Sequence, residues 1–160
     1  ERLARLADSV AGQVRRGNQI IDGMNQFAHS ADLPLERVDL GEAVDFVCRV
    51  AARLIAVKGR PPQIDRPALP VTVSANRFFL ENLIWSSLNR SMDTCAPDGT
   101  ITITVEPNQP GARIRFRGLA LDPARGGAPL PLLQEKMVAR FLGARLTADE
   151  GKAEIAIILG

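Results

Sequence analysis

This chain of 160 residues has few cysteines, no long apolar run and little net charge, and each of these features argues against a class of protein. Its two cysteines, Cys48 and Cys95, have neither C-x-x-C nor metal-ligand spacing, so we expect buried free thiols rather than a disulfide or a zinc site. No apolar run is long enough to cross a membrane and no signal-peptide pattern is present, which predicts a cytoplasmic segment without membrane contact. The net charge of +2 is too small to indicate a nucleic-acid partner.

Histidine is also scarce, and the motifs of common nucleophilic and metal enzymes are missing. The one histidine, His29, falls near the C-terminal end of a predicted helix, where the helix dipole favours its charged form. The sequence contains no G-x-S-x-G, H-E-x-x-H or P-loop motif. Function therefore has to be inferred from the predicted fold and from the residues that the fold brings together.

The N-terminal part of the chain is predicted to be a helix over residues 2–29. Its apolar positions recur at steps of three and four, and the stripe is wide enough for a helical bundle. One helix cannot bury such a stripe alone, so we expect a partner helix from a second subunit or from upstream sequence; packing on the chain's own domain is the alternative. The stripe comprises Leu3, Leu6, Val10, Val14, Ile20, Ile21, Met24 and Phe27.

A helix, a turn and a strand between residues 74 and 105 organise the rest of the chain. The helix shows one buried stripe and Ser74 is its expected N-cap. Pro97, Asp98 and Gly99 supply turn chemistry, and a strand over 100–106 then alternates isoleucine and valine with threonine. The stripe consists of Leu80, Leu83, Ile84, Leu88 and Met92.

The elements on either side follow the same rules. Asp39 with Glu42 three residues later predicts a capped helix start. Arg113, Arg115 and Arg117 alternate with apolar residues, which favours a strand with a solvated basic face over a phosphate site. The predicted elements are a helix over 40–57, strands near 63–65, 71–73 and 112–117, a helix over 132–142 with Leu133, Met137, Val138 and Phe141 inward and Gly143 as C-cap, and a hairpin of 144–149 with 153–159.

Two stretches carry a resemblance to a known family. Residues 38–44 read V-D-L-G-E-A-V, similar to the "V-D-L-x-E-x-V" entry into the nucleotide domain of sensor histidine kinases. The helix and turn at 74–99 resemble the N-box helix and P-x-G-G turn of the GHKL, or HATPase, domain in that family. The resemblance implies an α+β fold, a two-layer α/β sandwich whose mixed sheet is covered by about three helices. It also implies that residues 1–32 form one helix of a dimerisation hairpin and that 33–160 form the ATPase-type domain.

The N box, N-L-L-x-N-A in the family, can be aligned in two registers. Alignment through Asn89 puts Trp85 at the first asparagine and Arg90 at the alanine, whereas alignment through Asn82 puts Ser86 at the second asparagine. Because an N-box asparagine holds magnesium in this family, the resemblance marks Asn82 and Asn89 as candidate nucleotide-binding residues. Asn89 is the candidate magnesium ligand.

The two glycine boxes depart from the family pattern. The first, D-x-G-x-G, is replaced by Gly118-Leu119-Ala120-Leu121-Asp122, so a glycine stands where an acid would bind adenine. Asp122 is the candidate substitute, four positions later. The second box, G-x-G, reads Pro129-Leu130-Pro131, and proline has no amide hydrogen to offer a phosphate. We therefore expect a degenerate nucleotide site and no bound cofactor, with ATP and magnesium only if the substitutes act.

Three functions remain open at this point. The first is a two-component signalling protein, a pseudokinase that acts by protein contacts or phosphotransfer, homodimeric through its N-terminal helix and docking a response-regulator receiver domain. ATP-independent bacterial histidine phosphotransferases are a similar case. The second is a divergent but active ATP-dependent histidine kinase, and the third is a structural dimerisation module. His29 lacks the H-E/D-x-x-x-P context of a phospho-acceptor.

Overall fold

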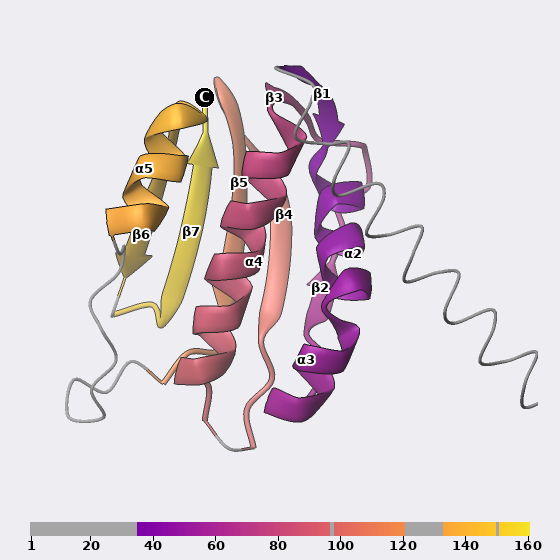
Figure 1. Cartoon of the computed structure of the whole chain (residues 1–160), viewed down its shortest axis with the longest axis vertical. Coiled ribbons are helices and arrows are strands. Elements are labelled where there is room, and N and C mark those ends of the chain that lie inside the picture. The colour runs from indigo at the N-terminus through magenta and orange to yellow at the C-terminus, as the bar shows by residue number, and fades with distance from the viewer. Residues whose placement is uncertain (1–34, 97, 121–132, 150) are drawn as a thin grey trace, which may run out of the picture.

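The computed structural model describes residues 35–96, 98–120, 133–149 and 151–160 (Figure 1). The predicted helix 2–29, the dimerisation segment 1–32 and His29 lie outside these ranges. The described elements are β1 (Glu36–Asp39), α2 (Leu40–Val50), α3 (Ala52–Lys58), β2 (Gln63–Asp65), β3 (Thr72–Ala75), α4 (Arg77–Thr94), β4 (Thr102–Asn108), β5 (Gly111–Arg117), α5 (Leu133–Phe141), β6 (Ala144–Asp149) and β7 (Glu154–Leu159).

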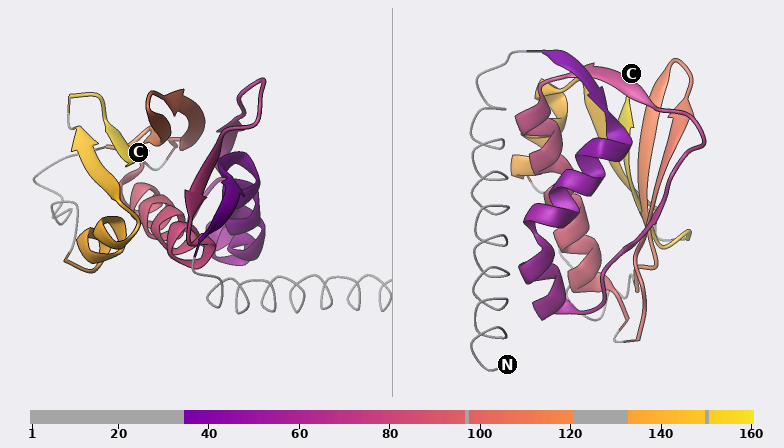
Figure 2. Two further views of the ribbon diagram at one scale, coloured as in Figure 1. Left: turned by 90° about the horizontal axis from the view of Figure 1, so that it is seen from above. Right: turned by 90° about the vertical axis from the view of Figure 1, so that its right-hand side faces the viewer.

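The strands form one large mixed sheet and one small one. The five-stranded sheet has the order β2-β4-β5-β7-β6, in which β2 and β4 are parallel and the other neighbours are antiparallel. A separate antiparallel pair joins β1 to β3. Figure 2 shows the helices on one face of the large sheet. The predicted α+β, two-layer architecture is therefore confirmed.

The core lies between the large sheet and α4. Alternation in β4 and β5 sends Ile103 and Val105, and opposite them Ile114 and Phe116, toward the helices. The apolar stripe of α4 meets them as predicted, with Leu80, Leu83, Ile84 and Leu88 fully buried. Burial of one such side chain contributes about 1.5–3 kcal/mol to stability, so this layer of contacts fixes α4 firmly on the sheet.

Two details of the predicted helices are wrong. Ser74 pairs with Arg37 in the β3 to β1 ladder, so it cannot cap α4; the Asn76 side chain does so by accepting a hydrogen bond from Phe79 N at 3.1 Å. The predicted helix 40–57 is interrupted at Ala51, whose ψ of 3° departs from the helical value. At the start of α2, by contrast, Asp39 accepts from Glu42 N at 3.0 Å, as the capping pattern predicted.

The orientation predicted for α5 is wrong for three of its four residues. Leu133, Met137 and Phe141 were expected to point inward, but they are 74%, 65% and 68% exposed. Val138, the fourth, is partly buried and packs against the core. The buried residues of α5 are instead Glu135 and Ala139. Glu135 lies 3.3 Å from Arg90 of α4, so an ion pair turns this side of the helix toward the core. Gly143 ends the helix with a φ of +65°, which confirms the predicted C-cap.

The predicted basic face of β5 lies on the side of the sheet opposite the helices, where two glutamates pair with its three arginines. Arg113 Nε lies 2.9 Å from Glu106 Oε1, and Arg115 Nη2 lies 2.5 Å from the other oxygen of Glu106. Arg117 Nε lies 3.0 Å from Glu154 Oε2. The three arginines therefore belong to a cross-strand ladder of ion pairs rather than to an open basic surface.

Both cysteines are free thiols, as expected, but each is partly exposed rather than buried. Burial, with a smaller contribution from Asp45, raises the pKa of the Cys48 thiol to about 11. Within the described ranges, no helix combines the length and apolar character that crossing a bilayer requires. Nor does the described part of the chain contain a group of three or more metal-ligating side chains that could hold an ion.

Candidate nucleotide site

The candidate site is bounded by α4, the segment after β5 and the helix α5. Figure 1 shows α4 at the centre of the helical layer, with α5 on one side and α2 and α3 on the other. The side of α4 that faces α5 makes two direct contacts with that helix. The rings of Phe79 and Phe141 lie 4.6 Å apart between centroids, and Arg90 forms the ion pair with Glu135. These contacts hold α4 and α5 together along the side where the N box would face a nucleotide.

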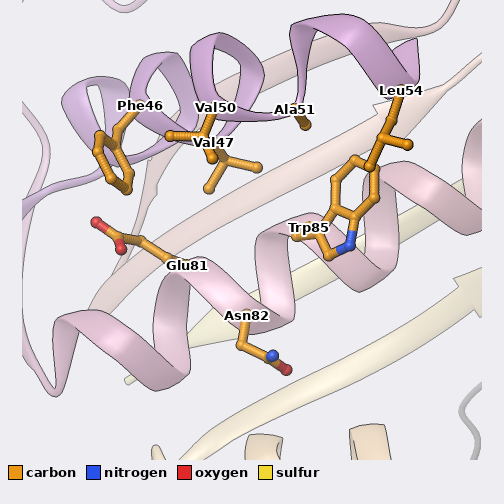
Figure 3. Close-up of a pocket in the computed structure, with 8 residues that line it drawn as sticks. All are labelled: Phe46, Val47, Val50, Ala51, Leu54, Glu81, Asn82 and Trp85. Atoms are coloured by element: carbon orange, nitrogen blue, oxygen red, sulfur yellow. The ribbon is translucent and has the colours of Figure 1, made fainter. Parts of the chain in front are cut away.

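Burial along α4 favours the N-box register through Asn82. In that register Leu83 and Ile84, both fully buried, take the two leucine positions, and the buried Ser87 takes the position of the small alanine. The register through Asn89 would put the polar Ser86 in the first leucine position and the half-buried, ion-paired Arg90 in the alanine position. Asn82 itself is exposed, and Figure 3 shows its amide pointing away from α2.

Asn89 faces a different neighbour. Its Oδ1 accepts a hydrogen bond from Lys58 Nζ at 2.7 Å, and the same ammonium contacts Asp93. A magnesium ion at Asn89 would therefore have to compete with a cation from α3. Seven residues separate Asn89 from Asn82, about 10 Å along the helix axis, too far for the two amides to share one ion with metal to oxygen distances near 2 Å.

The first glycine box begins inside the fold. Gly118 has a φ of +94°, and a Cβ at this position would meet Thr100 O at 2.4 Å, so the glycine is required by the backbone path. Ala120 N donates to Thr94 O at 2.7 Å, and Leu119 N donates to Ala153 O at 3.4 Å. Both amides after Gly118 are thus used within the domain. Asp122 and the second box, Pro129-Leu130-Pro131, lie outside the described residues.

A buried acid on the other side of α4 was missed by the sequence analysis. The Glu81 side chain is 0% exposed and faces α2 across an apolar cavity (Figure 3). Arg77 Nη1 lies 3.6 Å from Glu81 Oε1, while Arg77 Nε makes a 2.7 Å contact with Glu36 of β1. Burial, opposed by Arg77, raises the pKa of Glu81 to about 7. In the sequence, Glu81 lies between Leu80 and Leu83, two residues of the predicted buried stripe. This position could have indicated that its side chain is buried.

Comparison with solved structures identifies the fold. The catalytic domain of histidine kinase ThkA matches with a TM-score of 0.60 and 13% identity over 79% of this chain and 96% of that chain. The ATP-binding domain of PrrB from Mycobacterium tuberculosis matches with a TM-score of 0.57 and 14% identity over 79% and 97%. The chain has the histidine-kinase catalytic-domain fold. Histidine kinase AdeS from Acinetobacter baumannii matches over 97% of this chain and 83% of its own, with a TM-score of 0.59 and 15% identity.

The chain resembles histidine kinases in its fold rather than in its sequence. No protein-family model matches the chain, and no curated protein matches its sequence. At identities of 13–15% the comparison establishes the fold and leaves the chemistry to the site residues. Within the histidine-kinase fold, α4 is the helix on which the N box is expected, and the segment after β5 is where the first glycine box is expected.

Proposed function

We propose that this chain is a histidine-kinase-like domain of a two-component signalling protein whose nucleotide site is degenerate. It acts through protein contacts or phosphotransfer rather than as an ATP-dependent kinase. The observation that carries this proposal is the use of the Ala120 amide, which donates to Thr94 O at 2.7 Å. A backbone amide needed for a nucleotide in the first glycine box is thereby committed to the end of α4.

The chemistry at Gly118 supports the same proposal. Adenine recognition in the family uses an acid at this position, and glycine offers no side chain to accept the hydrogen bond. The clash that a Cβ would make with Thr100 O means that an acid could not occupy the position without a shift of the backbone. Both features of Gly118 support a degenerate nucleotide site.

The contacts between α4 and α5 support it further. In the register that burial favours, Asn82 and Ser86 take the two asparagine positions, and Ser86 is too short to replace the second amide as a ligand. The carboxylate of Glu135, 8% exposed, lies on the α5 side of this surface. Arg90 is paired with this carboxylate, so its guanidinium is already engaged within the domain.

Partners follow from the proposal. We expect a homodimer through residues 1–32 and a receiver domain of a response regulator as the docking partner. The structural likeness to the histidine kinase AdeS supports this expectation. If phosphotransfer is the mechanism, the phosphorylated histidine comes from outside this sequence, because His29 lacks the expected motif.

An active kinase is the second candidate. It is favoured by one observation, the exposed Asn82 in the N-box register on α4, where an amide oxygen is accessible to a cation. This function would also require Asp122 to replace the lost adenine acid and Asn82, rather than Asn89, to hold magnesium.

Calorimetric titration with ATP and magnesium separates the two candidates. The whole chain should show no saturable heat at millimolar ATP while circular dichroism shows it folded. Asn82→Ala and Asn89→Ala should behave identically to the parent chain. Saturable binding that Asn82→Ala abolishes and Asn89→Ala preserves would overturn the proposal and establish the kinase alternative. Loss in Asn89→Ala instead would overturn both the proposal and the register assigned from burial.

A sedimentation experiment tests the partner prediction. The chain alone should sediment as a dimer at micromolar concentration, and a receiver domain added in excess should move the boundary to a faster species. A monomer at all concentrations, with no complex formed by any of a set of receiver domains, would contradict the protein-contact mechanism.

A further inference from the structure

A cavity of about 180 Å³ lies between α4 and the helices α2 and α3, and its lining includes Asn82, one of the candidate nucleotide-site residues. Figure 3 shows Val47, Val50 and Leu54 on one wall and Trp85 on the other, with Glu81 at one end. Val50 and Leu54 are about half exposed, so the cavity opens to solvent. An engineered apolar cavity of about 150 Å³ holds benzene, so this one has room for an aromatic ring.

Glu81 is a charged group without a hydrogen-bond partner at the end of this cavity. Its side chain is 0% exposed and neither carboxylate oxygen makes a hydrogen bond. The 3.6 Å separation from Arg77 is an ion pair but exceeds hydrogen-bond distance. A buried carboxylate without hydrogen bonds costs folding free energy, so a ligand that donates to it would gain the bonds that the fold does not supply.

The local charge favours a cation as that ligand. Arg77 is the cation shared by Glu36 and Glu81, and its closer contact, at 2.7 Å, is with Glu36. On α2, the Arg49 guanidinium lies over the ring of Phe46, 5.5 Å from its centroid. The group formed by Glu36, Glu81 and Arg77 by itself carries one net negative charge when Glu81 is ionised, and an ammonium group would neutralise that charge.

We propose that the cavity between α2, α3 and α4 binds a small apolar primary amine with an aromatic body. Its ammonium group donates hydrogen bonds to Glu81, and its ring packs between Leu54 and the indole of Trp85 (Figure 3). The break between α2 and α3 at Ala51, which lines the cavity, separates the two turns that carry Val50 and Leu54. This inference does not depend on the proposed signalling function, because the contacts that carry it come from Glu81, Leu54 and Trp85. Asn82 lines the cavity and is also a candidate nucleotide-site residue.

Tryptophan fluorescence measures this binding directly, because Trp85 is the only tryptophan and the chain has no tyrosine. The test ligand is 2-phenylethylamine, and its neutral counterpart 2-phenylethanol is the matched control. We expect a saturable change in Trp85 emission with the amine and at least tenfold weaker binding of the alcohol. Glu81→Gln, which removes the charge and keeps the shape, should weaken the amine at least tenfold and leave the alcohol unchanged.

A second pair of variants tests whether loss of binding comes from the cavity itself or from a general effect on the fold. Leu54→Arg places a long cation at the mouth of the cavity and should abolish amine binding. Val57→Arg is the control, because Val57 is 81% exposed on the same helix and does not line the cavity. It should bind like the parent chain, and circular dichroism should show all variants folded.

The pH dependence gives an independent measure. Because the pKa of Glu81 is raised to about 7, chiefly by burial, the amine should bind roughly tenfold more tightly at pH 8 than at pH 6 as Glu81 ionises. Three results would overturn the inference: no saturable emission change at millimolar amine, equal binding of the amine and the alcohol, or unaltered amine binding by folded Glu81→Gln. If another part of the chain occupies the cavity, the amine will cause no saturable emission change, and the inference is overturned.

Discussion

Arg90 on α4 and Glu135 on α5 form an ion pair 3.3 Å apart, and their side chains are only 17% and 8% exposed. This pair joins two helices that lie 45 residues apart in sequence. The helix turns this carboxylate, rather than Leu133 or Met137, toward α4. A polar contact therefore contributes to the orientation of α5, together with the packing of Val138, Ala139 and Phe141.

Substitution of Arg90 should destabilise the domain. Arg90→Ala removes a cation from a largely buried carboxylate, and we expect the free energy of unfolding to fall by about 1–3 kcal/mol. Urea unfolding followed by circular dichroism measures the change. Arg140→Ala, at an exposed position on α5, should change stability by less than about 0.5 kcal/mol. Equal stabilities of the two variants would contradict the role assigned to the pair.

Gly118 should not tolerate a side chain. Gly118→Ala would force a φ of +94° on a residue with a Cβ and bring that Cβ to 2.4 Å from Thr100 O. We expect a loss of at least about 2 kcal/mol in urea unfolding experiments. The control is Gly151→Ala, where the nearest atom to a Cβ, Asp149 Oδ1, is at an ordinary distance of 3.5 Å. A Gly118→Ala chain as stable as this control would show that the segment can relax.

Glu81 should make stability depend on pH. Its pKa is about 7 in the folded chain and near 4.5 when unperturbed, so the folded state holds the proton more tightly. The resulting stabilisation is fully present below pH 4.5, is lost as pH rises toward 7, and has vanished above it. Across this window the loss should be roughly 2–4 kcal/mol.

Comparison with Glu81→Gln isolates this contribution. The difference in unfolding free energy between parent and variant, measured in urea at pH 5, 6, 7 and 8, should change most between pH 5 and 7 and little beyond. A constant difference would mean that Glu81 titrates normally. Carboxylates elsewhere titrate in both chains and cancel in the difference.

Cys48 should react slowly with thiol reagents. Because its pKa is raised to about 11 from 9.0, chiefly by burial, the thiolate fraction at pH 8 is about a hundredfold smaller than in an unperturbed thiol. The variant Cys95→Ser leaves Cys48 as the sole thiol, and its modification by iodoacetamide can be followed by mass spectrometry. The same variant in urea provides the reference rate. Similar rates with and without urea would refute the prediction.

The fold was largely predictable from local patterns. Alternation in β4 and β5 and the stripe of α4 gave the strands, the central helix and its buried residues correctly. Two of the errors arose where a polar residue found a partner far away in sequence, and a third was the break of the predicted helix 40–57 at Ala51. Ser74 is paired with Arg37 across the β1 to β3 ladder, and Glu135 is paired with Arg90, so neither capping nor amphipathic rules applied to them.

The candidate site was less predictable than the fold. Asn82 and Asn89 were equivalent in the sequence, and burial of Leu83, Ile84 and Ser87 was needed to prefer one register. The roles of Asn82, Asn89 and Asp122 in nucleotide or magnesium binding stay predictions. Glu81 escaped notice because an acid on a helix is usually exposed, and its burial results from the position of α2.

The ion-pair ladder of β5 has a consequence for the behaviour of the protein at high concentration. None of the described elements covers the sheet face that carries Arg113, Arg115 and Arg117 (Figure 2). An open face of threonine and valine would invite another sheet to stack on it. Here, bringing two such faces together would strip water from rows of paired charges, at a cost that apolar contact could not repay. The charges therefore act against aggregation through this face of the sheet.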